Sequence, residues 1–302
     1  MYLTFDEYIT PPGEGATGST LCEDLRPGLS RDKATMVQGQ WSSLSADSAP
    51  ATQPEPPDPV RFARENLGLE PDPRQIEVLQ SKATRGILNC SRQWGKSTIA
   101  AAKAVHLAYT QPDSLILIAS PSKRQSAELL RKIEAMVRKL KIRPRGDGDN
   151  PASLLLPNGS RIVALPGAEA TVRGFSGVSM LLIDEAARMD DDAYNSLRPV
   201  LATVDKGQLW MMSTPWGKRG FFYDTWAHGG EDWMRLSVPA TDCDRIRPDY
   251  LEDERRVMGP VFFGQEFLCE FVDVDGSVFD RDLIEAALDD HLEPIDFTGT
   301  WN

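Results

Sequence analysis

The sequence predicts an α/β fold with a mostly parallel central sheet that is flanked by helices. Short apolar runs of strand length alternate with helical patterns through most of the chain. These runs are continuous, without alternating polar residues, which indicates strands that are buried on both faces of a sheet. The 302 residues, of which 41% are hydrophobic, suffice for one large domain with appendages.

The chain divides by composition into three parts. Residues 1–59 are rich in Gly, Ser, Thr and Pro and end in APATQPEPPDP, which predicts a flexible arm and a stiff linker. We expect a folded domain over residues 60–275. Residues 276–302 are expected to form an acidic C-terminal linker.

The predicted elements of the folded part follow one another as strands and helices. Apolar runs predict strands at 86–90, 114–120, 178–184 and 208–213. Helical patterns are found at 96–109, 122–140 and 190–201. Residues 153–157 and 161–166 predict a hairpin around Asn158-Gly159, a pair typical of a type I′ turn.

Charge is distributed unevenly along the chain. The net charge of −12 is matched by the segment 241–302 alone, which holds 17 acidic and 5 basic residues. Residues 123–145 carry nine basic and two acidic residues. This basic segment is either a solvated helix face or a contact with a polyanion or another subunit, and the sequence leaves these alternatives open.

Several classes of protein are disfavoured by composition. No apolar run has the length of a membrane span and the N-terminus lacks the pattern of a signal peptide, so no membrane partner is expected. The four cysteines and three histidines are dispersed, without the spacing of a disulfide framework or a zinc site. A reducing cytoplasm fits this cysteine usage.

A phosphate-binding loop of the Walker A type is indicated by NCSRQWGKSTIAA, residues 89–101. A strand, a polar loop and a helix follow one another here, and Lys96 and Ser97 are placed to reach phosphates and Mg²⁺. The usual first glycine is replaced by Cys90, and a helix start capped by Ser or Thr is the structural alternative. The candidate ATP- and phosphate-binding residues are Ser91, Gln93, Trp94, Gly95, Lys96, Ser97 and Thr98.

A second motif, MLLIDEAA, ends a buried strand with two carboxylates. A carboxylate in this position needs a positive partner, and nucleotide-bound Mg²⁺ would supply one to Asp184. Glu185 would orient the attacking water and accept its proton. Ser213, Thr214 and Pro215 end the next strand, where hydroxyl groups can sense the γ-phosphate, although an ordinary turn is the alternative. Gln75 is a candidate for reading the adenine edge or, alternatively, a solvated helix residue.

Three stretches together resemble the ATPase domain of the large terminase subunit of tailed bacteriophages, the motor that packages DNA. They are SRQWGKST, GFSGVSMLLIDEAA and MMSTPWGKRGFFYDTW, within residues 60–275. The resemblance implies a P-loop NTPase fold of the RecA/ASCE type. It also accounts for the missing first glycine, because phosphate loops of this family often lack it and carry Arg-Gln before Gly-Lys.

The resemblance assigns roles to individual residues. It implies that Lys96 and Ser97 bind phosphate and Mg²⁺, that Asp184 belongs to the metal site, and that Glu185 is catalytic. Ser213, Thr214 and Pro215 match the motif that couples hydrolysis to movement. Two arginines are candidates for stabilising the transition state: Arg173 from a neighbouring subunit, and Arg92 within the same subunit, where sensing is the favoured role. A surface salt bridge is the alternative for each.

The expected function is therefore an ATP-hydrolysing motor subunit that translocates double-stranded DNA into the viral procapsid. The family implies Mg²⁺ and ATP, a homo-oligomeric ring, most simply a pentamer, and contacts with the portal protein and the small terminase subunit. It also implies the host cytoplasm, with transient docking on the procapsid. No nuclease activity is expected from residues 1–302, because the family's RNase H-like domain would follow them.

Two other functions remain open from sequence. A DEAD-like helicase is suggested by IDEAA, but too few residues follow Pro215 for a complete second lobe. A nucleotide-binding assembly module, inactive without its partners, is the other alternative. The dependence of hydrolysis on protein concentration and on DNA would discriminate between these functions.

Overall fold

The computed structural model describes residues 56–150, 152–165 and 174–272. Most of the predicted N-terminal arm, the predicted linker 276–302 and Arg173 lie outside these ranges. The domain boundaries therefore stay predictions. The first described helix, α1, is Pro59–Glu65, and the Asp58 side chain caps it by accepting from two backbone N–H groups.

A seven-stranded sheet forms the centre of the fold, in the order β3-β4-β2-β5-β6-β1-β7. The strands are β1 (Arg85–Cys90), β2 (Leu115–Ala119), β3 (Ser153–Leu155), β4 (Arg161–Ala164), β5 (Val178–Asp184), β6 (Gln208–Ser213) and β7 (Met234–Val238). Every neighbouring pair is parallel except β3 and β4. The predicted mostly parallel sheet is confirmed.

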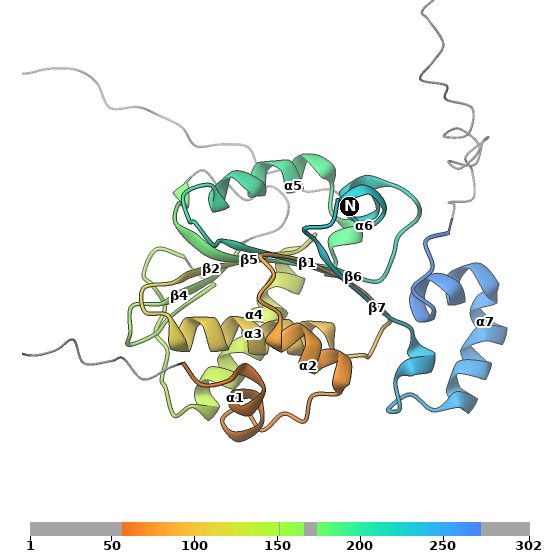
Figure 1. Ribbon diagram of the computed structural model, residues 1–302, viewed down its shortest axis with the longest axis horizontal. Coiled ribbons are helices and arrows are strands. Elements are labelled where there is room, and N and C mark those ends of the chain that lie inside the picture. The colour runs from red at the N-terminus through yellow and green to blue at the C-terminus, as the bar shows by residue number, and fades with distance from the viewer. Residues whose placement is uncertain (1–55, 151, 166–173, 273–302) are drawn as a thin grey trace, which may run out of the picture. The chain divides into compact units, whose positions relative to one another are not determined.

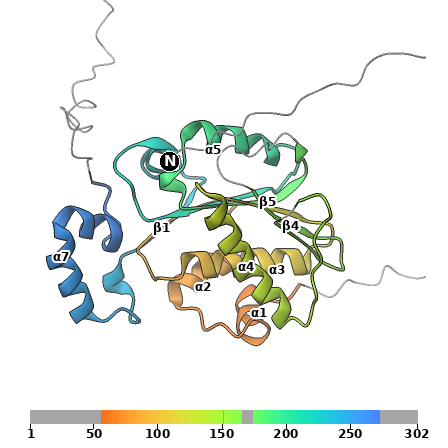
Figure 2. The ribbon, with the colours of Figure 1, turned by 180° about the vertical axis from the view of Figure 1, so that it is seen from behind.

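Helices cover both faces of this sheet (Figures 1 and 2). One face carries α1, α2 (Pro73–Gln80), α3 (Lys96–Thr110) and α4 (Lys123–Lys139); the other carries α5 (Asp191–Leu197) and α6 (Gly220–His228). Strand residues alternate between the two cores: in β2, Ile116 and Ile118 pack with the first layer and Leu117 and Ala119 with the second. Both faces are buried, which explains the continuous apolar runs.

A smaller unit follows β7 and lies beside the edge of the sheet (Figure 1). It consists of η4 (Ala240–Asp242) and α7 (Pro248–Phe267), which share a small apolar core of Ala240, Leu251, Phe263 and Phe267. A kink at Gly259, with φ of 76°, and Pro260 divides α7. Among the described helices, none is long and apolar enough to span a membrane.

The structure departs from the sequence predictions in several places, and α1, α6 and α7 had no predicted counterpart. The predicted helix 190–201 is α5 followed by the 3₁₀ turn η3 (Arg198–Leu201), in which Pro199 has no N–H to continue an α-helix. β7 was not predicted: its sequence MRLSV lacks the continuous apolar run of the central strands and alternates polar with apolar residues, as is usual for a strand at the sheet edge. The hairpin exists, but its turn is not type I′.

The φ angles at Asn158 and Gly159 determine the type of this turn. A type I′ turn requires positive φ at both residues, whereas here Gly159 has φ of 84° and Asn158 is not among the positive-φ residues. The Gly159 N–H donates to Leu156 O at 3.1 Å and the Leu156 N–H to Ser160 O at 2.9 Å. The loop is therefore the three-residue type, in which a turn over Pro157 and Asn158 ends at a left-handed glycine.

Gly86 of β1 tests the packing between the sheet and the helices α1 to α4. It pairs with Trp210 of β6, and a β-carbon at Gly86 would overlap the indole ring. Trp210 is 1% exposed and Lys103 Nζ lies 4.6 Å from its ring centroid, so the ring has little freedom to move. We expect Gly86→Ala to lower the free energy of unfolding by about 1–3 kcal/mol in denaturant titrations.

Gly146→Ala is the matched control for this prediction. Its β-carbon would meet no atom within 4 Å, so its effect should be small. Equal stabilities of the Gly86→Ala variant and the wild type would contradict the packing argument.

Candidate active site

The phosphate loop Ser91–Gly95 connects the end of β1 to the first residue of α3, Lys96. Gln93 and Gly95 have φ of 66° and 102°, so the loop turns through the left-handed region at these two positions. Cys90 has no positive φ and is fully buried, with a thiol pKa raised well above its usual range by burial. A glycine is therefore not required at Cys90, and its thiol is an inert core group.

The N–H groups of the loop fall into two sets. Ser91 N–H donates to Val238 O at 3.0 Å, and Arg92 N–H donates to Glu266 O at 3.2 Å. The backbone N–H groups of residues 93–97 have no acceptor in the described parts of the chain, and they lie at the N-terminus of the 15-residue α3. Such N–H groups favour an anion, so residues 93–97 are the candidate phosphate-binding segment.

The structure distinguishes the other candidate phosphate contacts. Ser91 is fully buried and its N–H is already bonded, so the structure does not place it at the phosphate site. The Trp94 side chain is 1% exposed and packs in the core, which leaves only its backbone at the loop. Thr98 lies in the first turn of α3, where its N–H donates to Gly95 O at 2.9 Å.

Gln75 of α2 forms a hydrogen bond with the backbone of the phosphate loop. Its Oε1 accepts from Asp72 N–H in a capping box, and its Nε2 donates to Trp94 O at 2.9 Å. Arg245 Nη2 donates to the same carbonyl at 2.5 Å. The oxygen and the nitrogen of the Gln75 amide are thus both hydrogen-bonded within the protein. A contact of Gln75 with adenine stays a prediction.

Ser97 and Asp184 form the candidate metal site. Asp184 is the last residue of β5, and its two carboxylate oxygens lie 3.5 and 3.4 Å from Ser97 Oγ. Burial, and then the neighbouring Glu185 charge, raises the pKa of Asp184 to about 6. A buried carboxylate beside a hydroxyl presents the oxygen ligands that Mg²⁺ prefers, so these residues fit the ion.

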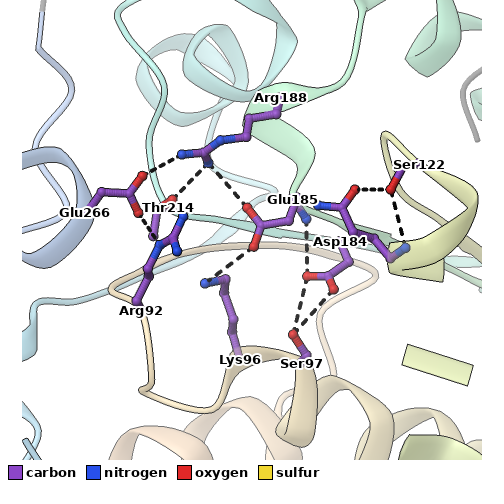
Figure 3. A network of polar contacts seen from close by, with 10 residues as sticks. Arg92, Lys96, Ser97, Ser122, Asp184, Glu185, Arg188, Thr214 and Glu266 are labelled. Atoms are coloured by element: carbon purple, nitrogen blue, oxygen red, sulfur yellow. Dashed lines mark hydrogen bonds and ion pairs between the residues drawn. The ribbon is translucent and has the colours of Figure 1, made fainter. Parts of the chain in front are cut away.

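Glu185 lies next to this site and is held by two cations (Figure 3). Its backbone is left-handed, with φ of 54°, which is uncommon for glutamate and typical of functional positions. Oε1 lies 3.9 Å from Lys96 Nζ, and Oε2 lies 3.3 Å from Arg188 Nη1. Lys96 therefore reaches from the phosphate loop toward the carboxylate at the end of β5.

The end of β6 completes the site between the two motifs, since β6 lies between β1 and β5. Ser213 is opposite Asn89 of β1, and Ser213 Oγ is buried without a hydrogen-bond partner in the described residues. Thr214 Oγ1 accepts from Arg188 Nη1 at 3.0 Å, and Pro215 is buried beside it. Of the three candidate coupling residues, Thr214 is thus in contact with Arg188, which also contacts Glu185.

Arg92 is bound to a carboxylate of α7 in this structure. Its Nε donates to Glu266 Oε2 at 2.6 Å, and this hydrogen bond raises the pKa of the Arg92 guanidinium. Sequence reasoning missed Arg188 and Glu266, which meet at 2.6 Å. Arg188 could have been suspected because it follows Glu185 by one helical turn; nothing in the sequence near Glu266 marks it.

Together, the strand–loop–helix around Lys96 and the carboxylates after β5 define a P-loop nucleotide-binding protein. The chain belongs to the terminase large subunit family: the model of the T4-like, N-terminal part of that subunit matches residues 87–286.

Individual relatives agree with the family model. The large terminase subunit of Escherichia phage T5 is 27% identical over 233 residues, which are 74% of this chain and 52% of the relative. The chain thus spans about half the length of this relative. The Thermus phage P74-26 large terminase ATPase domain has a TM-score of 0.62 and 22% identity, and covers 72% of this chain and 100% of its own.

A third relative was solved with a nucleotide. The large terminase of bacteriophage D6E in complex with ADP has a TM-score of 0.58 and 18% identity, covering 70% of this chain and 56% of its own. These similarities confirm the predicted fold and favour a terminase over a DEAD-like helicase fragment.

Proposed function

We propose that this chain hydrolyses ATP as the motor subunit of a phage terminase and drives double-stranded DNA into the procapsid. The observation that carries the proposal is the convergence of Lys96, Ser97, Asp184 and Glu185 at the carboxyl edge of the sheet. Family membership and the ADP complex of the D6E relative support it. ATP is the substrate.

The described residues suggest how each group acts in the reaction. Lys96 Nζ, now 3.9 Å from Glu185, would turn to the β- and γ-phosphates and release one oxygen of that carboxylate. Glu185 would then orient a water and accept its proton. Ser97 Oγ and the Asp184 carboxylate would hold Mg²⁺, which neutralises phosphate charge when bound.

Coupling to movement would pass through Thr214. This residue directly follows β6, and its hydroxyl shares Arg188 Nη1 with Glu185. Loss of the γ-phosphate would change the position of Glu185 and thereby the contacts of Thr214. Ser213 and Pro215 would carry this change into the following segment.

The assembly is proposed from the family. We propose a homo-oligomeric ring, most simply a pentamer, that binds double-stranded DNA and contacts the portal protein and the small terminase subunit. It would act in the host cell, docked transiently on the procapsid. Gln75 is proposed to contact adenine in addition to its structural contacts.

The test is phosphate release from Mg-ATP, measured across protein concentration and with and without double-stranded DNA. We expect the rate to rise with both, because neighbouring subunits and DNA complete the motor. ATP binding without hydrolysis under any condition would favour the assembly module. Absence of ATP binding would show that the phosphate loop has been misinterpreted.

The basic segment 123–145 is the proposed DNA surface. Its helix, α4, buries an apolar face and exposes its cations, of which Arg131 and Arg138 pair with glutamates on the same helix. Lys141 and Arg143, just after α4, are exposed and form no ion pair within the described residues. A motor that accepts any sequence must bind DNA through its phosphates.

We expect the double variant Lys141→Gln and Arg143→Gln to bind double-stranded DNA more weakly. Its salt dependence, log K against log[salt], should become shallower by about one unit per lost phosphate contact. Arg61→Gln, an exposed arginine paired with Glu65 on α1, is the control. Unchanged DNA affinity with an altered concentration dependence of hydrolysis would assign this surface to a subunit interface instead.

A further inference from the structure

Glu266, in the last turn of α7, joins two arginines from different parts of the active site (Figure 3). Its side chain is 11% exposed, Oε2 accepts from Arg92 at 2.6 Å and Oε1 accepts from Arg188 at 2.6 Å. Its carbonyl also accepts the Arg92 N–H at 3.2 Å. A carboxylate this buried is stable because both oxygens are paired with cations, so α7 is fastened to the site.

The Arg188 guanidinium contacts three side chains through its two terminal nitrogens. Nη2 binds Glu266, while Nη1 lies 3.3 Å from Glu185 Oε2 and 3.0 Å from Thr214 Oγ1. Its plane lies over the Trp216 ring, with Cζ 4.7 Å from the centroid. A planar fork can bridge these partners in one fixed geometry, which a lysine ammonium cannot.

Glu185 depends on this arrangement for its orientation. Lys96 and Arg188 hold one carboxylate oxygen each. When ATP draws Lys96 to its phosphates, Arg188 remains as the cation on Glu185. An ion pair that merely fastens α7 to the domain would not need to contact the proposed catalytic base.

We infer that Arg188 is a positioning residue for Glu185, and that Glu266 holds Arg188, so that the docking of α7 controls the alignment of the catalytic carboxylate. This inference rests on the ATPase activity proposed above. When α7 leaves the site, Arg188 loses Glu266 and Glu185 loses its fixed orientation. Hydrolysis is thereby confined to the arrangement in which α7 is docked.

The test compares Arg188→Gln, Arg188→Lys and Glu266→Gln in the full chain. We expect Arg188→Gln to lower kcat by about 10- to 100-fold, because the base is no longer aligned, with an unchanged Kd for a non-hydrolysable ATP analogue. Arg188→Lys should restore part of the rate, and Glu266→Gln should lower kcat without altering Kd. Arg256→Gln, which breaks an exposed pair with Asp253 on α7, is the matched control.

A double-mutant cycle separates positioning from a structural role. In a Glu185→Gln background, Arg188→Gln should cause no further loss of kcat, because its effect passes through Glu185. A full, multiplicative loss in that background would overturn the inference, as would weaker analogue binding with unchanged kcat. If thermal unfolding shows that Arg188→Gln does not fold, Arg188→Lys replaces it in the cycle.

The wild type and Glu185→Gln are measured first, so that the two proposals fail separately. No hydrolysis by the wild type at any concentration, with or without DNA, rejects the proposed function. Hydrolysis that Glu185→Gln abolishes, together with an unchanged kcat in Arg188→Gln, rejects the positioning role and leaves the ATPase intact.

Discussion

Glu185→Gln is expected to lower kcat for ATP hydrolysis by about 10²–10⁴-fold, the usual contribution of a general base. The amide keeps the size of the side chain, and its one oxygen can accept a hydrogen bond from either Arg188 or Lys96, but it cannot accept the proton of the attacking water. The loop N–H groups and Lys96 remain in place, so nucleotide binding should persist. Single-turnover phosphate release and equilibrium binding of an ATP analogue measure the two effects separately.

Glu65→Gln is the matched control, because this glutamate pairs with Arg61 on the surface of α1. It should leave kcat unchanged. A Glu185→Gln variant that hydrolyses ATP at the wild-type rate would show that another group activates the water, and a variant that loses analogue binding would show that Glu185 is required to shape the phosphate loop.

The sheet was predictable because its central strands are buried on both faces. Such strands are continuous apolar runs, and β5 and β6 coincide with their predicted ranges. The phosphate loop and the β5 carboxylates were predictable for a related reason: each follows directly after such a strand, and parallel strands bring their carboxyl ends to one edge. β7 was missed because an edge strand is exposed along one side, and its sequence contains Arg235 and Ser237.

The contacts that α7 makes could not be predicted from local sequence. Glu266 meets Arg92 and Arg188 only because the chain returns to the active site after β7, and no short-range pattern records such a return. Gln75 illustrates a related difficulty. Its residue type suits both an adenine contact and a helix cap, and the structure assigns it the cap and the Trp94 carbonyl.

Cys90 shows how the loop can dispense with its first glycine. Left-handed backbone is required at Gln93 and Gly95, whereas Cys90 completes β1 opposite Val238. A β-carbon at Gly95 would lie 3.1 Å from Gln75 Nε2 in addition to facing a backbone that disfavours it. The glycine that this loop requires is therefore the one before Lys96.

The transition state of ATP hydrolysis needs a further cation, and Arg92 and Arg173 are the two candidate arginines. Arg92 is bound to Glu266, which suits a sensing role. Arg173 lies outside the described residues and precedes β5 by five positions in sequence. We propose that it acts on the nucleotide of a neighbouring subunit, since an arginine supplied in trans is a common means of coupling subunits in a ring.

Arg173→Ala is expected to lower kcat by about 10³–10⁵-fold, with analogue binding unchanged. Mixing it with the Glu185→Gln variant should restore hydrolysis, because a subunit that keeps Glu185 can receive Arg173 from a neighbour that keeps it. The phosphate-release rate of the mixture, measured against its composition, should pass through a maximum at intermediate ratios. Arg61→Ala, an exposed arginine on α1, should neither lose activity nor need a partner. Two inactive variants that stay inactive when mixed would place Arg173 in its own subunit's site, and full activity of Arg173→Ala alone would return the role to Arg92.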